Sequence, residues 1–141
     1  MATNGAYAHR KGATRAFAPG HPTLPMAWRE LGQPVIIPGD MGRYSFVMLG
    51  SETAMRETFG SSCHGAGRVM SRGKATRQAR GRDLKAELAE QYVTVRARSR
   101  AGIAEEMPEA YKDVAEVVEV MEGAGLTRTV ARLKPFAVIK G

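Results

Sequence analysis

The sequence predicts a mixed α+β fold built from short strands and several helices. Segments rich in β-branched residues, such as 34–38 and 92–96, alternate with segments whose apolar residues recur at helical spacing, such as 114–121. The 16 glycines and 7 prolines divide the chain into short elements and predict many loops. With 141 residues, no internal repeat and no low-complexity linker, the chain is expected to form a single domain, residues 1–141.

Residues 1–33 are expected to be loop-rich, and residues 34–141 to hold most strands and helices, because the first part contains much glycine, proline and charge with little periodicity. We predict a short strand near Tyr7–His9 and then a long ordered loop, a kind of segment that is usually functional or disordered. Its basic and imidazole side chains allow two interpretations, a phosphate-binding surface or a solvated basic arm. These side chains belong to His9, Arg10, Lys11, Arg15 and His21.

Two strands and a helix are predicted next. Pro34–Pro38 is a short apolar run bounded by prolines, which predicts a strand buried on both faces. After a turn, Tyr44–Leu49 predicts a second strand. Residues 51–59 predict a short helix in which Ser51 is the N-cap and Gly60 is the stop signal.

Residues 68–85 form the most strongly charged stretch, with seven basic residues against a single acid. Helices are predicted near 71–80 and 82–91, the second with Leu84 and Leu88 facing inward. A run of this kind is usually a solvated face, but beside an anion-binding loop it is a candidate path for RNA. The seven basic residues are Arg68, Arg72, Lys74, Arg77, Arg80, Arg82 and Lys85.

A further strand is predicted over Tyr92–Arg96, where β-branched residues alternate with others. If the chain stays extended beyond this strand, Arg96, Arg98 and Arg100 project on one side of it, because side chains alternate with a period of two.

The last part of the chain predicts one helix and two strands. Pro108 is expected to open a helix from about residue 109, which ends at Gly123 or Gly125. Residues 126–139 then predict two short strands that are interrupted by a proline. The apolar face of the helix consists of Tyr111, Val114, Val117, Val118 and Met121.

His64 lies in a glycine-containing loop and is the strongest candidate for chemistry. Gly65 and Gly67 allow positive φ and a close approach to a ligand, and successive N–H groups in such a turn, followed by a helix start, form a concave site for anions. An imidazole there can act as a base, a metal ligand or a nucleophile that takes a phosphoryl or nucleotidyl group. Arg68 and Arg72 would lie on one face of a following helix, where both could grip phosphate oxygens. The alternative is a glycine-containing helix entry with a half-buried histidine.

Composition limits the class of protein. A net charge of +7 and a pI near 10.0 indicate an acidic partner, most simply a nucleic acid or a nucleotide. The single cysteine, Cys63, excludes an intrachain disulfide, and we expect its side chain to be a small buried filler. No apolar run is long enough to span a membrane and no signal peptide is evident, so a cytoplasmic location is expected.

One motif and its companions resemble a known family. The stretch Ser-Cys-His-Gly-Ala-Gly-Arg-Val-Met-Ser-Arg at 62–72 resembles the signature of the RtcB family of RNA ligases. Further resemblances follow in the family's order at His9–Phe17, Pro19–Pro22, Gln33–Gly39 with Met41-Gly42, Leu133–Pro135, and Lys140-Gly141. The resemblance covers roughly residues 7–141, and it implies an RtcB-like fold of which this chain is the C-terminal portion.

The resemblance implies an enzyme that joins an RNA 3′-phosphate or 2′,3′-cyclic phosphate end to a 5′-hydroxyl end, in tRNA splicing or RNA repair. GTP and manganese would be the cofactors. His64 matches the histidine that becomes guanylylated in the family. A neutral ring nitrogen suits this role, because it can attack the α-phosphorus of GTP and form a reactive phosphoramidate.

A guanosine pocket is also implied by the resemblance. Asp40 stands where the family's loop has a serine, and a carboxylate there would add repulsion near phosphates. Lys140 matches a position that touches the guanine, although a lysine one residue before the end of this sequence would otherwise be taken for a frayed tail. The implied nucleotide contacts are Pro38, Gly39, Asp40, Met41, Ser45, His64, Gly65, Ala66, Gly67, Tyr111 and Lys140.

The metal ligands are expected outside this chain, because its 3 histidines show no recognisable ligand spacing and the family's ligands come from a larger N-terminal portion. We therefore expect the chain alone to bind GTP weakly and not to guanylylate itself. The expected partners are GTP, RNA as tRNA halves or broken ends, the missing N-terminal portion and an activating protein. A noncatalytic RNA-binding or interaction module derived from the ligase is the alternative. RNA phosphates are expected to contact Arg68, Arg72, Lys74 and Arg77.

Overall fold

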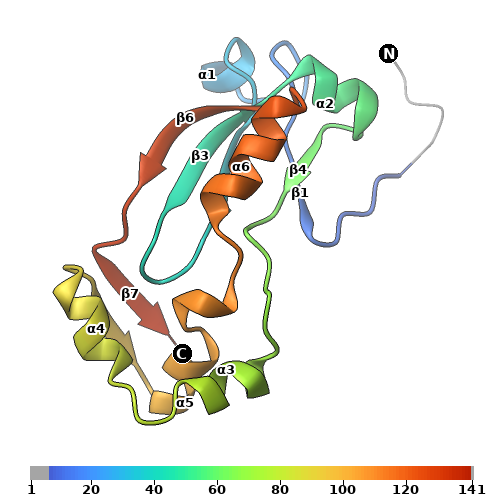
Figure 1. The fold of residues 1–141 in the computed structure, drawn as a ribbon. Coiled ribbons are helices and arrows are strands. Elements are labelled where there is room, and N and C mark those ends of the chain that lie inside the picture. Colours follow the sequence, from blue (N-terminus) through green and yellow to red (C-terminus); the bar gives the residue numbers. More distant parts are fainter. Residues whose placement is uncertain (1–6, 141) are drawn as a thin grey trace.

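A computed structural model describes residues 7–140 of the chain and confirms the predicted mixed α+β fold (Figure 1). In chain order the elements are β1 (Ala13–Arg15), α1 (Met26–Arg29), β2 (Pro34–Pro38), β3 (Ser45–Gly50), α2 (Glu52–Glu57), β4 (Ser61–Cys63), α3 (Arg72–Gln78), α4 (Leu84–Glu90), β5 (Thr94–Ala97), α5 (Arg100–Glu105), the 3₁₀ turn η1 (Pro108–Ala110), α6 (Val114–Gly123), β6 (Thr127–Leu133) and β7 (Ala137–Lys140).

An antiparallel sheet of order β2-β3-β6 forms one half of the molecule, and α6 packs on one of its faces (Figure 1). Val35 and Ile37 of β2 point into the core beneath α6, where Val114 and Val118 of the helix meet them. The side chain of Ile36 points to the other face and is 64% exposed. The prediction that this strand is buried on both faces is therefore wrong, because a helix covers only one side of the sheet.

A small antiparallel pair, β1 with β4, holds the N-terminal segment against the segment that leads to His64. Ala13 pairs with Cys63, and the amide N of Ala16 donates to the carbonyl O of Gly60 at 2.7 Å. No strand is present at Tyr7–His9, which corrects that prediction. The strand forms six residues further along the chain because its partner, Ser61–Cys63, lies beside 13–15 in the fold.

The elements α3, α4, α5, η1, β5 and β7 form a second part around its own hydrophobic core (Figure 1). We call this part the helical lobe, and the part built from β1–β4, α1, α2, α6 and β6 the sheet lobe. β5 and β7 pair in parallel, with Val95 opposite Val138. Met41, at the tip of the β2–β3 hairpin, is buried in the core of the helical lobe. The prediction of a single domain stays a prediction, since two hydrophobic clusters meet in this one chain.

Several predicted helices are confirmed with their caps. The hydroxyl O of Ser51 accepts a hydrogen bond from the amide N of Ala54 and begins α2, and the backbone of Gly60 turns back with φ +63° after it. The two helices predicted in the basic stretch are α3 and α4, and Leu84 and Leu88 of α4 are buried as expected. Local capping signals therefore located these elements well.

In the second half of the chain, the condition set for the arginines after the predicted strand is not met, and the predicted start of the last helix is wrong. Extended structure ends at Ala97, and Ser99 caps the unpredicted helix α5, so Arg100 turns away from the line of β5. The helix expected from residue 109 is instead a 3₁₀ turn, and α6 begins at Val114. The carboxylate of Asp113 caps α6, because it accepts a hydrogen bond from the amide N of Ala115 at 2.9 Å.

No helix among residues 7–140 combines the length and the apolar character that crossing a membrane requires.

Candidate functional site

A cavity of about 450 Å³ opens between the sheet lobe and the helical lobe. All eleven residues predicted to contact the nucleotide lie in its wall, although they come from four separate stretches of the chain. Three further residues complete the lining: Gly12, Glu106 and Val138. The predicted residues in the wall are Pro38, Gly39, Asp40, Met41, Ser45, His64, Gly65, Ala66, Gly67, Tyr111 and Lys140.

His64 follows directly after β4, and its side chain is exposed at the cavity. Backbone hydrogen bonds fix the loop on both sides: the amide N of His64 donates to Gly12 O at 3.3 Å, and that of Ala66 donates to Pro38 O at 3.0 Å. A Cβ at Gly65 would lie 3.1 Å from Pro38 O, so glycine permits this close approach to the hairpin. The loop therefore presents the imidazole to solvent while its own backbone is held.

The loop does not run straight into a helix, which corrects that expectation. Arg68 lies in an extended segment that bridges to Tyr111, and the amide N of Val69 donates to Ala110 O at 2.8 Å. The helix α3 begins only at Arg72, with Ser71 as its N-cap. Arg68 and Arg72 thus do not share a helix face.

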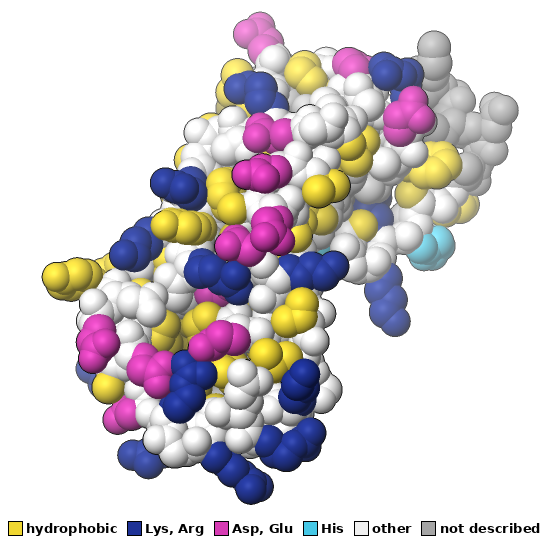
Figure 2. Space-filling model, in the orientation of Figure 1, with side chains coloured by type: hydrophobic (Ala, Val, Ile, Leu, Met, Phe, Trp, Pro, Cys, Tyr) yellow, Lys and Arg dark blue, Asp and Glu magenta, His cyan; other side chains and the backbone are white. Residues whose placement is uncertain are grey.

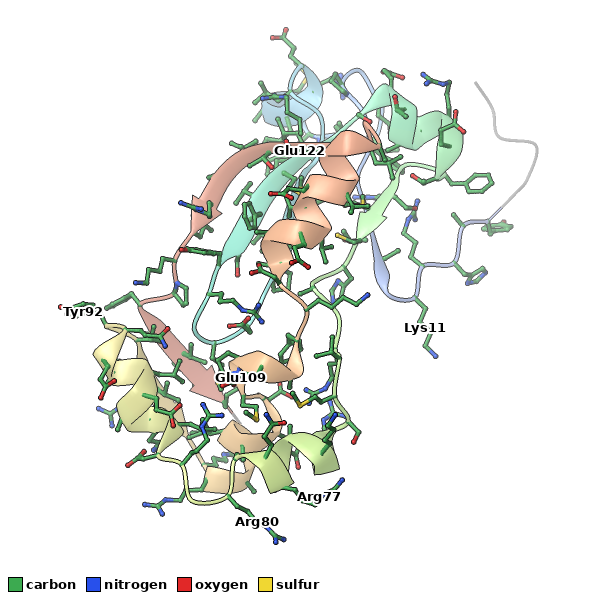
Figure 3. All side chains as sticks on the ribbon, viewed as in Figure 1. Lys11, Arg77, Arg80, Tyr92, Glu109 and Glu122 are labelled. Carbon is green, nitrogen blue, oxygen red and sulfur yellow. The ribbon has the colours of Figure 1, made fainter. Side chains whose placement is uncertain are left out.

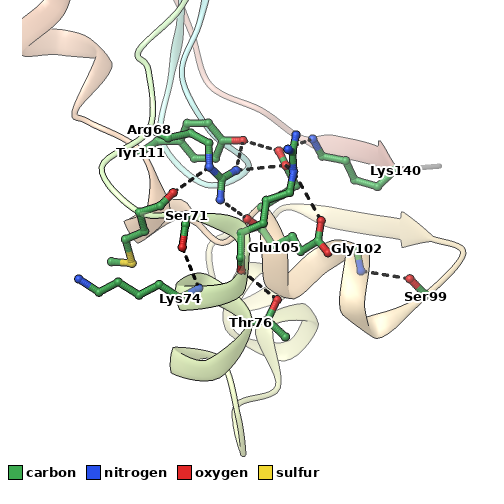
Figure 4. Close-up of polar contacts among 12 residues, drawn as sticks. Arg68, Ser71, Lys74, Thr76, Ser99, Gly102, Glu105, Tyr111 and Lys140 are labelled. Atoms are coloured by element: carbon green, nitrogen blue, oxygen red, sulfur yellow. Dashed lines mark hydrogen bonds and ion pairs between the residues drawn. The ribbon is translucent and has the colours of Figure 1, made fainter.

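The carboxylate of Glu106 joins cationic and phenolic groups at one end of the cavity. The Nη1 of Arg68 lies 3.2 Å from Glu106 Oε1 and donates to the hydroxyl of Tyr111 at 2.9 Å (Figure 4). The Tyr111 hydroxyl in turn donates to Glu106 Oε2, and the Nζ of Lys140 lies 3.4 Å from the same oxygen. We call these four residues the Glu106 network. It fixes Lys140 in the cavity wall, so that this lysine is not a frayed tail.

Two pKa values are shifted within the Glu106 network. Burial alone would raise the pKa of Glu106, but the hydrogen bond from Tyr111 and the positive charges of Lys140 and Arg68 outweigh it, and the pKa lies below its ordinary value of 4.5. Burial, followed by the hydrogen bond to Glu106 and the charge of Glu106, raises the pKa of Tyr111 above 10.0. At neutral pH the network therefore consists of a carboxylate, a protonated phenol and two cations.

Asp40 departs from the expectation that its charge would face the ligand. Its side chain is fully buried, and Oδ1 accepts hydrogen bonds from the amide N of Gly42 and of Arg43, both at 2.9 Å. Oδ2 pairs with the guanidinium of Arg43, whose Nη2 also donates to Pro108 O and Tyr111 O. The carboxylate therefore shapes the hairpin tip and is neutralised there, which removes most of the repulsion expected near phosphates.

The basic residues predicted to contact RNA fall into two groups. Arg68 pairs with Glu106, and the Nε of Arg72 lies 3.6 Å from Glu105 Oε2. Lys74 and Arg77 are exposed on α3 and form no ion pair with another residue of 7–140. The side chain of Arg77 extends away from the molecule (Figure 3).

The basic side chains of the N-terminal loop mostly hold the fold. Arg10 donates to the hydroxyl O of Ser61 and to Phe59 O, both at 2.8 Å, and the ring of His21 stacks on that of Phe17 at 3.8 Å. Among residues 7–33, only Gly12 lines the cavity. The interpretation of these five side chains as the lining of a phosphate site is thus not supported by their positions.

Cys63 is half-buried and packs against the core of the sheet lobe. Burial raises the pKa of its thiol, in agreement with a filler that is unreactive at neutral pH. Within residues 7–140, no group of three or more His, Cys, Asp and Glu side chains is placed so that it could hold a metal ion.

Sequence reasoning missed Gly12, Glu106 and Val138 as parts of the cavity wall. The only signal at Glu106 was an acidic cluster next to Pro108, which is typical of a helix start. Val138 reaches the cavity through the parallel pairing of β7 with β5, a contact that no local pattern reveals.

Fold and site together define a class: an α+β chain with a glycine-lined cavity whose wall carries an exposed histidine and one lysine, a set of groups that suits an anionic ligand. The comparisons with known proteins narrow this class. Residues 2–141 match the family model "tRNA-splicing ligase RtcB", so the chain belongs to the RtcB family, which confirms the resemblance.

Curated relatives bear the same name. The tRNA-splicing ligase RtcB of Thermococcus kodakarensis is 58% identical over 133 residues, which are 94% of this chain and 28% of that relative. Those of Pyrococcus abyssi and Archaeoglobus fulgidus are 56% and 54% identical over the same length, covering 14% and 28% of those proteins. The chain thus spans between 14% and 28% of the length of these three relatives.

Proposed function

We propose that this chain supplies the nucleophile and part of the guanosine pocket of a GTP-dependent RNA ligase. The observation that carries the proposal is the convergence of all eleven predicted residues on one cavity around an exposed His64. The alternative of a glycine-containing helix entry with a half-buried histidine does not fit an exposed imidazole in a loop that no helix follows directly.

In the proposed reaction, a ring nitrogen of His64 attacks the α-phosphorus of GTP. A P–N bond forms, the bond to the β-phosphate oxygen breaks, and pyrophosphate leaves, so the histidine carries GMP. An RNA 3′-phosphate oxygen then attacks the same phosphorus and releases the histidine. Finally, the 5′-hydroxyl of the second RNA end attacks the activated 3′-phosphate, and GMP leaves as the new phosphodiester forms.

The residues of the cavity have separate tasks in this proposal. The glycines around His64 leave room for the nucleotide phosphates near the backbone, which is held by the hydrogen bonds to Gly12 and Pro38. Tyr111 and Lys140, held by Glu106, offer a phenol and an ammonium group to the polar edge of the base. Arg68 does not line the cavity itself; its guanidinium donates to the Tyr111 hydroxyl and pairs with Glu106, and so positions both groups.

Manganese remains part of the proposal, with ligands outside this chain and with no step assigned to residues described here. RNA, as tRNA halves or broken ends, is the proposed partner, together with an N-terminal portion of the kind found in full-length relatives and an activating protein. The proposed location is the cytoplasm.

The intact mass of the chain after incubation with GTP and Mn²⁺ tests this function. The chain is measured alone and after addition of the N-terminal portion of the Thermococcus kodakarensis relative as a separate polypeptide. We expect a gain of one GMP only in the mixture, and its loss in His64→Ala. A gain by the chain alone would refute the assignment of the metal ligands to another polypeptide. No gain in a mixture that forms a complex would refute the proposed nucleotidyl transfer.

A noncatalytic RNA-binding module is the second candidate. The exposed cations of α3, which lie outside the cavity, favour it. It predicts RNA binding by the chain and no GMP transfer in any mixture, so the same mass measurement separates the two functions.

A further inference from the structure

The helical lobe contains a second groove, of about 600 Å³, between α3, α4 and α5. It shares no lining residue with the cavity at His64. Its apolar part is made by Ala79, Leu84 and Ile103, and its rim carries Arg80, Lys85 and Arg100. We call it the basic groove.

The charge of three cations at this rim is not neutralised by any acidic side chain of residues 7–140. Arg80, Lys85 and Arg100 are exposed, and none forms an ion pair with another residue of the described part of the chain. The fourth cation of the rim differs, because Arg82 lies 2.8 Å from Glu109 and also pairs with Glu87. The one acid in the lining, Asp83, caps α4 by accepting a hydrogen bond from the amide N of Ala86 at 3.2 Å.

The same positive surface continues beyond the groove. Figure 2 shows Lys and Arg side chains gathered at the lower end of the molecule, which is the helical lobe. Arg77 and Arg80 extend from the end of α3 into solvent (Figure 3). Lys74 lies one turn earlier on the same helix. A row of cations that are spaced along a surface matches a ligand whose negative charges repeat along its length.

The lining also indicates which part of such a ligand would be bound. Among residues 7–140, no aromatic side chain lines the groove, so this part of the chain offers no platform there on which bases could stack. Protein partners are usually anchored by buried aromatic residues and by deep apolar pockets, which this groove lacks. Guanidinium groups, in contrast, fit phosphate oxygens with two parallel hydrogen bonds.

We propose that the basic groove binds the sugar–phosphate backbone of single-stranded RNA through Arg80, Lys85 and Arg100, as a contact separate from the His64 cavity. The inference builds on RNA as the proposed partner, but it needs no GTP and no chemistry at His64. Because only phosphates are contacted, the groove binds with little sequence preference.

Fluorescence anisotropy with a labelled oligouridylate, at several KCl concentrations and without GTP or Mn²⁺, tests the proposal. The groove variant carries Arg80→Gln, Lys85→Gln and Arg100→Gln. The matched control carries Arg56→Gln, Arg128→Gln and Lys134→Gln, which are three exposed cations outside the groove. Both variants lower the net charge by three, and circular dichroism verifies that both fold.

Each phosphate contact with a single strand contributes about 0.7 to the slope of log K against log salt concentration, so the groove variant should lose about 2 units of slope. We also expect an affinity at least tenfold below that of the control variant at low salt. An equal loss in both variants, or no loss of slope in the groove variant, would refute the proposal. Polyglutamate of similar length should bind more weakly than RNA; equal affinity and salt dependence would instead identify an acidic protein as the partner.

The binding assay contains neither GTP nor Mn²⁺, so its result does not depend on nucleotidyl transfer at His64. A failure of GMP transfer would therefore leave this measurement unaffected, so the result for the basic groove is independent of the result for the proposed function.

Discussion

Removal of the charge of Glu106 is expected to destabilise the chain in a pH-dependent manner. Glu106→Gln keeps the shape of the side chain and an acceptor for the Tyr111 hydroxyl, but it removes the attraction to Arg68 and Lys140. The variant thus isolates the charge of the network from its hydrogen bond.

The ion-pair distances of Glu106 give the size of the expected loss of unfolding free energy. At separations of 3.2 and 3.4 Å, the Coulomb attraction of each pair is about 5 kcal/mol at an effective dielectric constant of about 20, and desolvation and side-chain ordering cancel most of it. The pair with Arg68 is mostly buried and should retain about 1.5 kcal/mol, whereas Lys140, with a side chain that is 34% exposed, should retain about 0.5 kcal/mol. Glu106→Gln therefore costs about 2 kcal/mol, and Glu106→Ala about 3 kcal/mol because Tyr111 also loses its acceptor.

Urea unfolding followed by circular dichroism measures this difference at pH 7 and pH 3. The folded-state pKa of Glu106 is depressed, so its stabilisation is present above 4.5 and is lost as the pH falls through the folded value. The gap between the unchanged chain and Glu106→Gln should be about 1 M in urea midpoint at pH 7 and should be clearly smaller at pH 3. The matched control, Glu119→Gln on the exposed side of α6, should leave the midpoint unchanged at both pH values. A gap of the same size at pH 7 and pH 3 would refute the reasoning.

Three further predictions concern backbone space, burial and capping. Gly39→Ala should lower the free energy of unfolding by more than 3 kcal/mol, because the added Cβ would overlap a backbone carbonyl oxygen. Gly67→Ala, with φ +77° and open space around it, should lower it by only about 1–2 kcal/mol. Equal thermal unfolding midpoints of the two variants would contradict this. Ile37→Ala should lower the free energy of unfolding, measured with urea, by about 2–5 kcal/mol. Ile36→Ala, on the open face of the same strand, should leave it almost unchanged. Similar losses in the two variants would mean that both faces of the strand are covered. Ser51→Ala should lower the free energy of unfolding by about 2 kcal/mol in the same assay, because it removes both the N-cap of α2 and the hydrogen bond from the hydroxyl to Gly125 O; an unchanged urea midpoint would contradict this.

Elements with a complete local signal were predictable from the sequence. The cap at Ser51, the inward pair Leu84 and Leu88, and the proline-bounded run of β2 all lie within one turn or one strand of the residues that decide them. The failures depend on partners that are distant in sequence. β1 forms where β4 lies beside it, and Ile36 is exposed because a single helix covers the sheet.

The candidate site shows the same division between local and distant information. Its His64 loop and hairpin residues were found from motifs, and the structure adds their convergence on one cavity. Glu106 could not be found in this way, because its role arises from Arg68, Tyr111 and Lys140, which meet it only in the folded chain. The neutralisation of Asp40 by Arg43 likewise depends on the hairpin turn, although the two residues are only three apart.

The placement of the cavity between two hydrophobic cores has a thermodynamic consequence. A ligand that touches Pro38 and Ser45 on one side and Tyr111 and Lys140 on the other can bind only while both lobes are folded and in register. The free energy of ligand binding then adds to the stability of both lobes together, by about 2.7 kcal/mol at a ligand concentration of about one hundred times Kd. If the proposed nucleotide binds in this cavity, it therefore couples the unfolding of the two lobes into one cooperative transition.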